Sequence, residues 1–289
     1  MRVCLMIEGQ EGVSWEQWVA LAQATENANL EGLFRSDHYR SIVRGEPAGS
    51  LDAWATLAGL AAVTSRIRLG TMVSPVTFRR VPVLAKMVAT VDHISGGRVE
   101  LGLGAGWFEA EHEAYGFDFP PLSQRLDELD RQLAEIVRHW DAAPEIQPKP
   151  LQQPHPPIIV GGTAKPRTVR AAVAHAHEYN TVWPTVAKAG ERRRAVDDAA
   201  RAAGREPLVF SMMTSCVVAD DPAELEERLA AFKAVTGREE PAISGTIEEV
   251  VGQLRQYEEV GIGRVMLQHI AHEDVDMVEV LGRVAAQLG

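Results

Sequence analysis

Residues 81–107 read VPVLAKMVATVDHISGGRVELGLGAGW and contain one helix followed by one strand. Apolar residues three and four positions apart predict an amphipathic helix over 81–94. The short apolar run after it predicts a buried strand over 98–103, and glycines and a tryptophan follow that strand. Alternation of such helices and strands is typical of parallel α/β folds.

The same alternation extends in both directions from this stretch. The predicted strands are 2–7, 32–36, 66–73, 98–103, 157–160, 178–182, 208–219 and 264–268. The predicted helices are 14–29, 51–64, 81–94, 123–140, 166–177, 187–203 and 275–288, and two more begin near 221 and 246. Eight strand–helix pairs without a domain linker predict an α/β fold, a single (β/α)₈ TIM-type barrel domain over 1–289 with insertions, in preference to an open doubly wound sheet.

Local signals place several helix starts. Ser14-x-x-Gln17 and Thr246-x-x-Glu249 are capping boxes. Asp221 followed by proline is an N-cap with proline at the first helical position. The proline-rich segment 144–157 is interpreted as an insertion before the fifth strand, because the strand–helix alternation resumes directly after it.

Composition narrows the class of protein. The formal net charge is −11, which disfavours nucleic acid and anionic membranes as partners. Cys4 and Cys216 lie in apolar runs without CxxC spacing, so both are expected to be buried free thiols of a cytoplasmic protein. The apolar runs fall short of the ~20 residues of a membrane span, and the first is too short for a signal peptide.

In a (β/α)₈ barrel the active site is built at the carboxyl ends of the strands. Asp37 and His38 follow the second predicted strand. Neighbouring residues leaving a strand point to different sides, so one could bind a cofactor while the other transfers a proton. The structural alternative is a capping Asp37 and a packed, hydrogen-bonded His38.

Two glycine-containing turns also stand at strand ends. Gly161-Gly162-Thr163 opens a helix that carries Arg167, which suits an anion such as a cofactor phosphate; the alternative is an ordinary strand-to-helix turn. The run from Gly102 to Gly106 lacks the spacing of a dinucleotide fingerprint, and its small residues favour a ring system lying against the barrel.

The histidines show no metal-site spacing, so no metal is expected. Arg79-Arg80 is by default a solvated pair, or else it receives an acidic tail of a ligand.

Several strand-end segments together resemble the luciferase-like superfamily, and more narrowly its branch that uses the deazaflavin coenzyme F-420. They are Ser36-Asp37-His38, the runs 70–79 and 97–107, Val160-Gly161-Gly162 and the run 264–268. The similarity covers nearly the whole chain, with the motifs in the expected order.

The resemblance implies a barrel that holds F-420 at its mouth. His38 would be the catalytic proton donor or acceptor, and Asp37 a cofactor-contacting acid. The non-proline cis peptide expected behind the ring would fall at Met72–Val73. The other cofactor contacts implied are Ala105, Trp107, Gly161, Gly162, Thr163 and Arg167. A homodimer is also expected from the family.

The chain departs from the best-known sugar-phosphate dehydrogenase of that branch. A glutamate and an asparagine follow the fourth strand there, whereas Trp107 and Ala110 or Glu111 fall nearby here. No lysine and arginine set matches its sugar-phosphate contacts, so glucose-6-phosphate is not the expected substrate.

The hypothesis is hydride transfer between the deazaflavin and a small organic substrate. Two alternatives remain: an FMN-dependent monooxygenase that uses O₂ and a separate reductase, and a non-catalytic flavin-binding protein. Trp183, Met213 and His269 are candidate substrate-pocket residues, and they could equally belong to the core.

Overall fold

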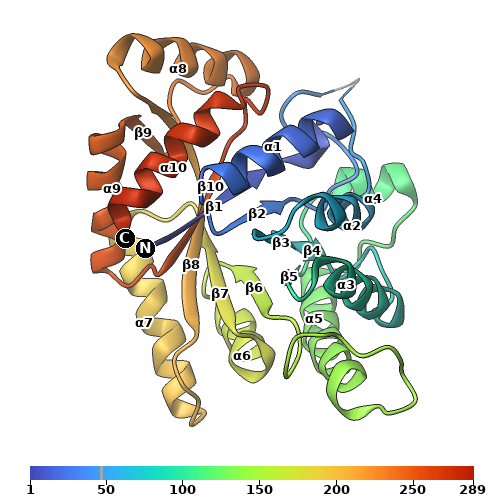
Figure 1. Ribbon diagram of the computed structural model, residues 1–289. Helices are drawn as coiled ribbons and strands as arrows, with labels where there is room; N and C mark the ends of the chain where they lie inside the picture. Colours follow the sequence, from blue (N-terminus) through green and yellow to red (C-terminus); the bar gives the residue numbers. More distant parts are fainter. Residues whose placement is uncertain (46–47) are drawn as a thin grey trace.

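The computed structural model describes residues 1–45 and 48–289, and within these ranges the chain forms a closed barrel. Its parallel strands follow the order β10-β1-β2-β3-β5-β6-β7-β8. Pairing of β8 with β10, with Arg264 opposite Ser211, closes the ring. Helices surround the strands (Figure 1). The predicted (β/α)₈ barrel is confirmed.

The strands of the barrel are short and almost entirely buried. They are β1 (Arg2–Ile7), β2 (Gly32–Arg35), β3 (Arg68–Thr71), β5 (Val99–Gly104), β6 (Ile158–Gly162), β7 (Glu178–Val182), β8 (Val209–Ala219) and β10 (Arg264–Gln268). The helices are α1 (Trp15–Asn27), α2 (Ala53–Val63), α3 (Val81–Ser95), α4 (Glu109–Tyr115), α5 (Leu122–Val137), α6 (Pro166–His175), α7 (Val186–Ala202), α8 (Pro222–Thr236), α9 (Ile247–Glu259) and α10 (Asp276–Leu288).

The predicted helix starts are confirmed. Ser14 and Gln17 form a reciprocal capping box at α1. The Asp221 side chain accepts from the first backbone amides of α8. The Thr246 amide donates to Glu249 at α9. Each cap satisfies N–H groups that a helix start leaves without partners.

Five of the described elements were not predicted, and the first of them is the short helix η1 (Gly9–Glu11) after β1. β4 (Ser74–Pro75) pairs with β5, and β9 (Ile243–Thr246) pairs with the end of β8 beyond the barrel. The helix α4 lies inside the segment expected to be a loop-rich insertion. The fifth helix ends at Val137, and a π-helical turn, η2 (Arg138–Ala142), follows it. Two- and four-residue strands arise from long-range pairing, which local periodicity does not report.

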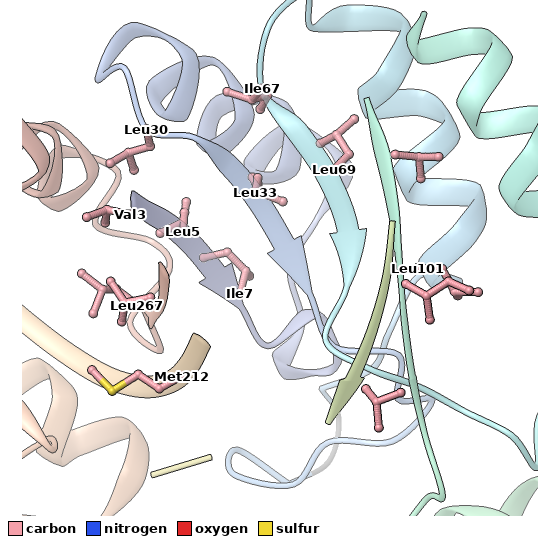
Figure 2. Packing of buried hydrophobic residues seen from close by; sticks show 14 of the residues in the cluster. Val3, Leu5, Ile7, Leu30, Leu33, Ile67, Leu69, Leu101, Met212 and Leu267 are labelled. Atoms are coloured by element: carbon pink, nitrogen blue, oxygen red, sulfur yellow. The ribbon is translucent and has the colours of Figure 1, made fainter. Parts of the chain in front are cut away.

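Strand alternation divides the core into two layers. Val3, Leu5 and Ile7 of β1 face outward into the main cluster between strands and helices, and Figure 2 shows them among side chains of neighbouring strands. Cys4 and Met6 of the same strand face the barrel interior, where they belong to a second cluster. The two-residue period of a strand separates the two layers.

A network of charged side chains fills the amino-terminal end of the barrel interior. Arg264, at the start of β10, donates to Glu100 at 2.7 Å and to Glu178 at 3.0 Å. It also pairs with Glu31 at 2.9 Å, and Arg68 pairs with Glu100. Arg264, Glu100 and Glu178 are buried, so their charges depend on one another for stabilisation.

Cys4 and Cys216 are buried and unbonded, as expected. Burial raises the pKa of each thiol to about 12. Among the described helices, none combines the length and the apolar character that crossing a membrane requires.

Candidate active site at the barrel mouth

His38 follows β2 at the carboxyl end of the barrel and is held by a carboxylate from α4. Its Nδ1 donates to Glu111 Oε1 at 2.7 Å, while the Tyr39 amide donates to Glu111 Oε2 at 3.0 Å. Glu111 is 1% exposed and the His38 side chain 15% exposed. Nε2 of His38 has no hydrogen-bond partner among the described residues, so this nitrogen is available for proton exchange.

The environment of His38 favours the protonated imidazole. Burial lowers the pKa of His38, but the hydrogen bond and the charge of Glu111 outweigh it, and the net direction is upward. The ring also lies edge-on to Trp107, with centroids 5.7 Å apart. His38 can therefore deliver a proton near neutral pH.

We expect Glu111→Gln to lower the pKa of His38, because the charge of Glu111 and its charge-assisted hydrogen bond, the largest effects that oppose burial, are lost. NMR titration of the His38 ring protons should show a wild-type midpoint above the usual ~6.5 and a variant midpoint below it. Because the pKa of His38 is higher in the folded than in the unfolded chain, its protonation contributes its full stabilisation below about pH 6.5. That contribution is lost as the pH rises through the folded-state pKa. Equal midpoints in the two proteins would contradict the assigned role of Glu111.

Asp37 is buried in an ion pair. Arg79 donates to Oδ2 at 2.5 Å and to Oδ1 at 3.2 Å, and the Ser74 hydroxyl donates to Oδ2 at 2.6 Å. Arg79 also binds Asp52 at 2.9 Å. The default interpretation of Arg79 as a solvated residue is wrong, because its side chain is only 8% exposed. Through Ser74 and Arg79, Asp37 thus ties the end of β2 to β4 and to the segment after it.

The loop after His38 is anchored by a second carboxylate. Glu11, in the short helix η1 (Gly9–Glu11) after β1, accepts from the amides of Ile42, Val43 and Arg44 at 2.8, 3.1 and 2.8 Å. The Ser41 hydroxyl adds a fourth bond at 2.7 Å. Burial would raise the pKa of Glu11, but these hydrogen bonds hold it below its usual value.

Val73 lies over a platform of glycines. The Met72–Val73 peptide bond is cis, as expected. A Cβ on Gly104 would come within 2.6 Å of a Val73 methyl, and one on Gly161 within 3.2 Å. A Cβ on Gly102 would meet the Thr71 carbonyl. The glycines of β5 and β6 therefore leave room for Val73 at the mouth.

Gly104→Ala should destabilise the protein by about 1–3 kcal/mol, because the new methyl overlaps Val73. Urea unfolding measures the change, and Val73→Ala in the same chain should restore most of it. Gly252→Ala is the matched control: no atom lies near its added methyl on α9, so stability should rise by about 0.5–1 kcal/mol. Full stability of Gly104→Ala alone would refute the packing assigned to Val73.

The turn predicted to bind phosphate lies at the start of α6. Gly161 and Gly162 end β6, and Thr163 is exposed. The helix follows within three residues of Thr163, so its free N–H groups face the same end of the barrel. Arg167 is directed elsewhere: it pairs with Asp127 and donates to the Ser123 carbonyl.

Aromatic side chains form the rim. Trp107, after β5, is 62% exposed and stacks on Phe108, and Trp183, after β7, is 52% exposed. Met213 is half-buried and packs with Val73 against the inner cluster. Ala105 is half-buried between Gly104 and the rim.

His269 is placed differently from the other pocket candidates. It is 2% exposed, its Nε2 donates to the Asp274 carbonyl, and burial lowers its pKa to about 4. It lines a cavity of about 10 Å³ that Phe232 of α8 also lines. The structure therefore does not bring His269 to the rim with Trp183 and Met213.

Sequence reasoning did not connect Glu111 to His38, which lies 73 positions away. It also missed Glu8 and Gln10 and gave no role to Gln268, although these three residues meet at the ends of β1 and β10. The position of Glu8 directly after the first strand was the available signal, by the strand-end rule that singled out His38.

Comparison with known sequences finds one family over most of the chain. The family described as Luciferase-like monooxygenase matches residues 2–241. An uncharacterized protein of Mycobacterium tuberculosis is 33% identical over 173 residues, which are 55% of this chain and 59% of that protein. The chain thus matches less than two-thirds of that relative's length.

Two solved structures have the same fold over their whole length. Monooxygenase RslO1 from Streptomyces bottropensis superposes with a TM-score of 0.82 and 23% identity, covering 99% of this chain and 98% of that chain. An F420-dependent secondary alcohol dehydrogenase, solved with an F420-acetone adduct, has a TM-score of 0.83 and 16% identity, covering 100% and 99%. At these identities, the likeness concerns the fold.

Proposed function

Because this chain belongs to the luciferase-like monooxygenase family, whose members are flavin-dependent oxidoreductases, we propose that it is a coenzyme F-420-dependent oxidoreductase. It transfers a hydride between the deazaflavin and a small organic substrate, with His38 exchanging the accompanying proton. The dehydrogenase of the same fold supports this proposal by the cofactor named for it.

The observation that carries the proposal is the His38–Glu111 pair. Glu111 fixes the ring through Nδ1 and leaves Nε2 without a partner at the mouth. A hydride added to a carbonyl or imine carbon must be matched by a proton on the heteroatom, and the raised pKa of His38 favours the protonated imidazole that can supply it. Such a group beside the reacting carbon would accelerate the transfer by supplying the proton directly.

The residues at the mouth fit a flat ring with a phosphate-bearing tail. Val73 offers an apolar surface, and Trp107 and Trp183 flank the mouth from different strands. Gly161, Gly162 and the start of α6 would receive the phosphate. The deazaflavin would supply the hydride-carrying carbon, while the protein orients the substrate and keeps water away.

The second candidate is an FMN-dependent monooxygenase. RslO1, with the same fold and 23% identity, is named a monooxygenase. The apolar Val73 surface and the anion-binding turn would hold either ring system. The two proposals differ in which cofactor binds more tightly, so cofactor affinity separates them.

We would titrate the purified protein with F-420 and separately with FMN, following the fluorescence of cofactor and protein. Micromolar F-420 binding with much weaker FMN binding is the expected result. The reverse preference would overturn the F-420 proposal and favour the monooxygenase. Binding of either cofactor without turnover on any ketone, imine or enone tested would instead indicate a non-catalytic flavin-binding protein.

A further inference from the structure

A second polar cluster stands at the mouth, apart from the His38–Glu111 pair. Glu8 directly follows β1, and Gln268 is the last residue of the neighbouring strand β10. Cys4 and Met6 of β1 and Met266 of β10 face the barrel interior, so by strand alternation Glu8 and Gln268 face it too. In the barrel order, β1 lies four strands from β6 in either direction. Glu8 therefore lies across the mouth from Gly161.

The direction of the hydrogen bonds in this cluster is determined by its one carboxylate. Gln268 Nε2 donates to Glu8 Oε1, and Gln10 Nε2 donates to Glu8 Oε2 at 2.8 Å. The Ser36 hydroxyl donates to Gln10 Oε1 and accepts from the Gly9 amide. Because a carboxylate has no hydrogen to donate, both amides must turn their NH₂ groups toward Glu8.

This arrangement leaves hydrogen-bond acceptor capacity unused on both Gln268 and Glu8. Gln268 Oε1 is buried and has no hydrogen-bond partner among the described residues. Glu8 is half-buried and keeps unused lone pairs on both oxygens. A buried acceptor without a partner costs about 1–3 kcal/mol, so a donor from a ligand would be stabilising.

We propose that Glu8 and Gln268 bind a protonated nitrogen group of the substrate, such as an ammonium, iminium or amidinium. The inference rests on the proposed function, because it assigns a substrate class to the same mouth. A cationic nitrogen supplies two N–H donors and a charge opposite to that of Glu8. An anionic substrate group would be repelled by the charge of Glu8, and a neutral donor would lack the attraction of that charge.

The position of the cluster agrees with a substrate contact. Ser36, two residues before His38, is hydrogen-bonded to Gln10 and to the Gly9 amide, and Gln10 in turn is bound to Glu8, so Glu8 and His38 belong to one region of the mouth. The Val73 surface belongs to the far side of the barrel, with the glycines of β5 and β6. A substrate lying between that surface and β1 would place its nitrogen group on Glu8 and its reacting atom near His38.

The test uses three probes of the same shape: benzamidinium, benzamide and benzoate. Each is titrated into the full chain, with and without saturating F-420, by isothermal titration calorimetry. Benzamidinium should bind with the highest affinity and benzoate should not bind. Glu8→Gln should weaken benzamidinium binding roughly 10–100-fold, and Gln268→Met, which removes the free carbonyl, should weaken it roughly 3–10-fold. Glu279→Gln, at an exposed position on α10, should change nothing.

Equal affinities for benzamide and benzamidinium would overturn the proposal, and so would a higher affinity for benzoate. An unchanged benzamidinium affinity in Glu8→Gln would also overturn it. So would a failure of benzamidinium to bind both in the presence and in the absence of F-420. F-420 affinity, measured on each variant, keeps this result separate from the proposed function. Normal F-420 binding with no discrimination among the probes removes only the substrate class. If the wild-type chain does not bind F-420, the proposed function itself is overturned.

Discussion

Replacing His38 by alanine is expected to reduce turnover about 10²–10⁴-fold, the usual contribution of a general acid or base. The imidazole is the group at the mouth whose Nε2 is free and whose pKa is raised by Glu111. Alanine removes the proton donor and leaves the apolar Val73 surface in place. The rate is measured from the absorbance change of F-420 with a ketone, imine or enone that the wild-type protein turns over. F-420 affinity is measured in parallel.

The matched control is His93→Ala. His93 lies on α3, and its Nε2 donates to the Lys149 carbonyl in an exposed setting, away from the strand ends. Its loss should leave turnover within about twofold, because exposed substitutions usually change stability by less than ~0.5 kcal/mol. If His38→Ala retains the wild-type rate with cofactor bound, His38 is not the acid or base. If both variants lose activity equally, general instability explains the loss.

Arg264→Met should destabilise the fold by about 3–5 kcal/mol, the typical cost of removing one partner from a buried ion pair. Arg264 is 1% exposed and binds both Glu100 and Glu178. Methionine fills a similar volume but leaves two buried carboxylates facing each other with Arg68 as the remaining partner of Glu100. Urea unfolding followed by circular dichroism gives the change in unfolding free energy.

A surface arginine supplies the comparison for that experiment. Arg283 pairs with Asp220, and both side chains are about half exposed. Arg283→Met should therefore change stability by no more than about 1 kcal/mol. Adding Glu100→Gln and Glu178→Gln to Arg264→Met should recover part of the loss, since fewer unpaired charges remain buried. A loss below 1 kcal/mol for Arg264→Met alone would show that the network is not needed for folding.

The barrel could be predicted from the sequence because its signals are local. Apolar runs, capping residues and the strand–helix rhythm each depend on residues close together in the chain, as in the Ser14 and Thr246 capping boxes. The strand β9 depends on β8 extending past the barrel, with Cys216 opposite Ile243. The helix α4 buries polar Glu111 and His112, so it has no apolar face to predict.

In the candidate site, too, local sequence signals predicted some features and not others. Strand ends located His38, Val73 and Gly161, because the barrel brings all carboxyl ends to one face. The partners of these residues come from far along the chain: Glu111 is 73 positions from His38, and Arg79 is 42 positions from Asp37. Pairing over such separations is set by tertiary packing. The sequence therefore identified candidate chemistry at single positions and left the pairs undefined.

The Glu11 anchor has a consequence for how the sequence of the loop after His38 can diversify. Three of its four hydrogen bonds come from main-chain amides of residues 42–44. Every amino acid except proline carries that donor, so the anchor does not depend on which side chains stand there. Residues 42–44 can therefore be substituted, for example in a randomised library, while their main-chain hydrogen bonds to Glu11 are kept.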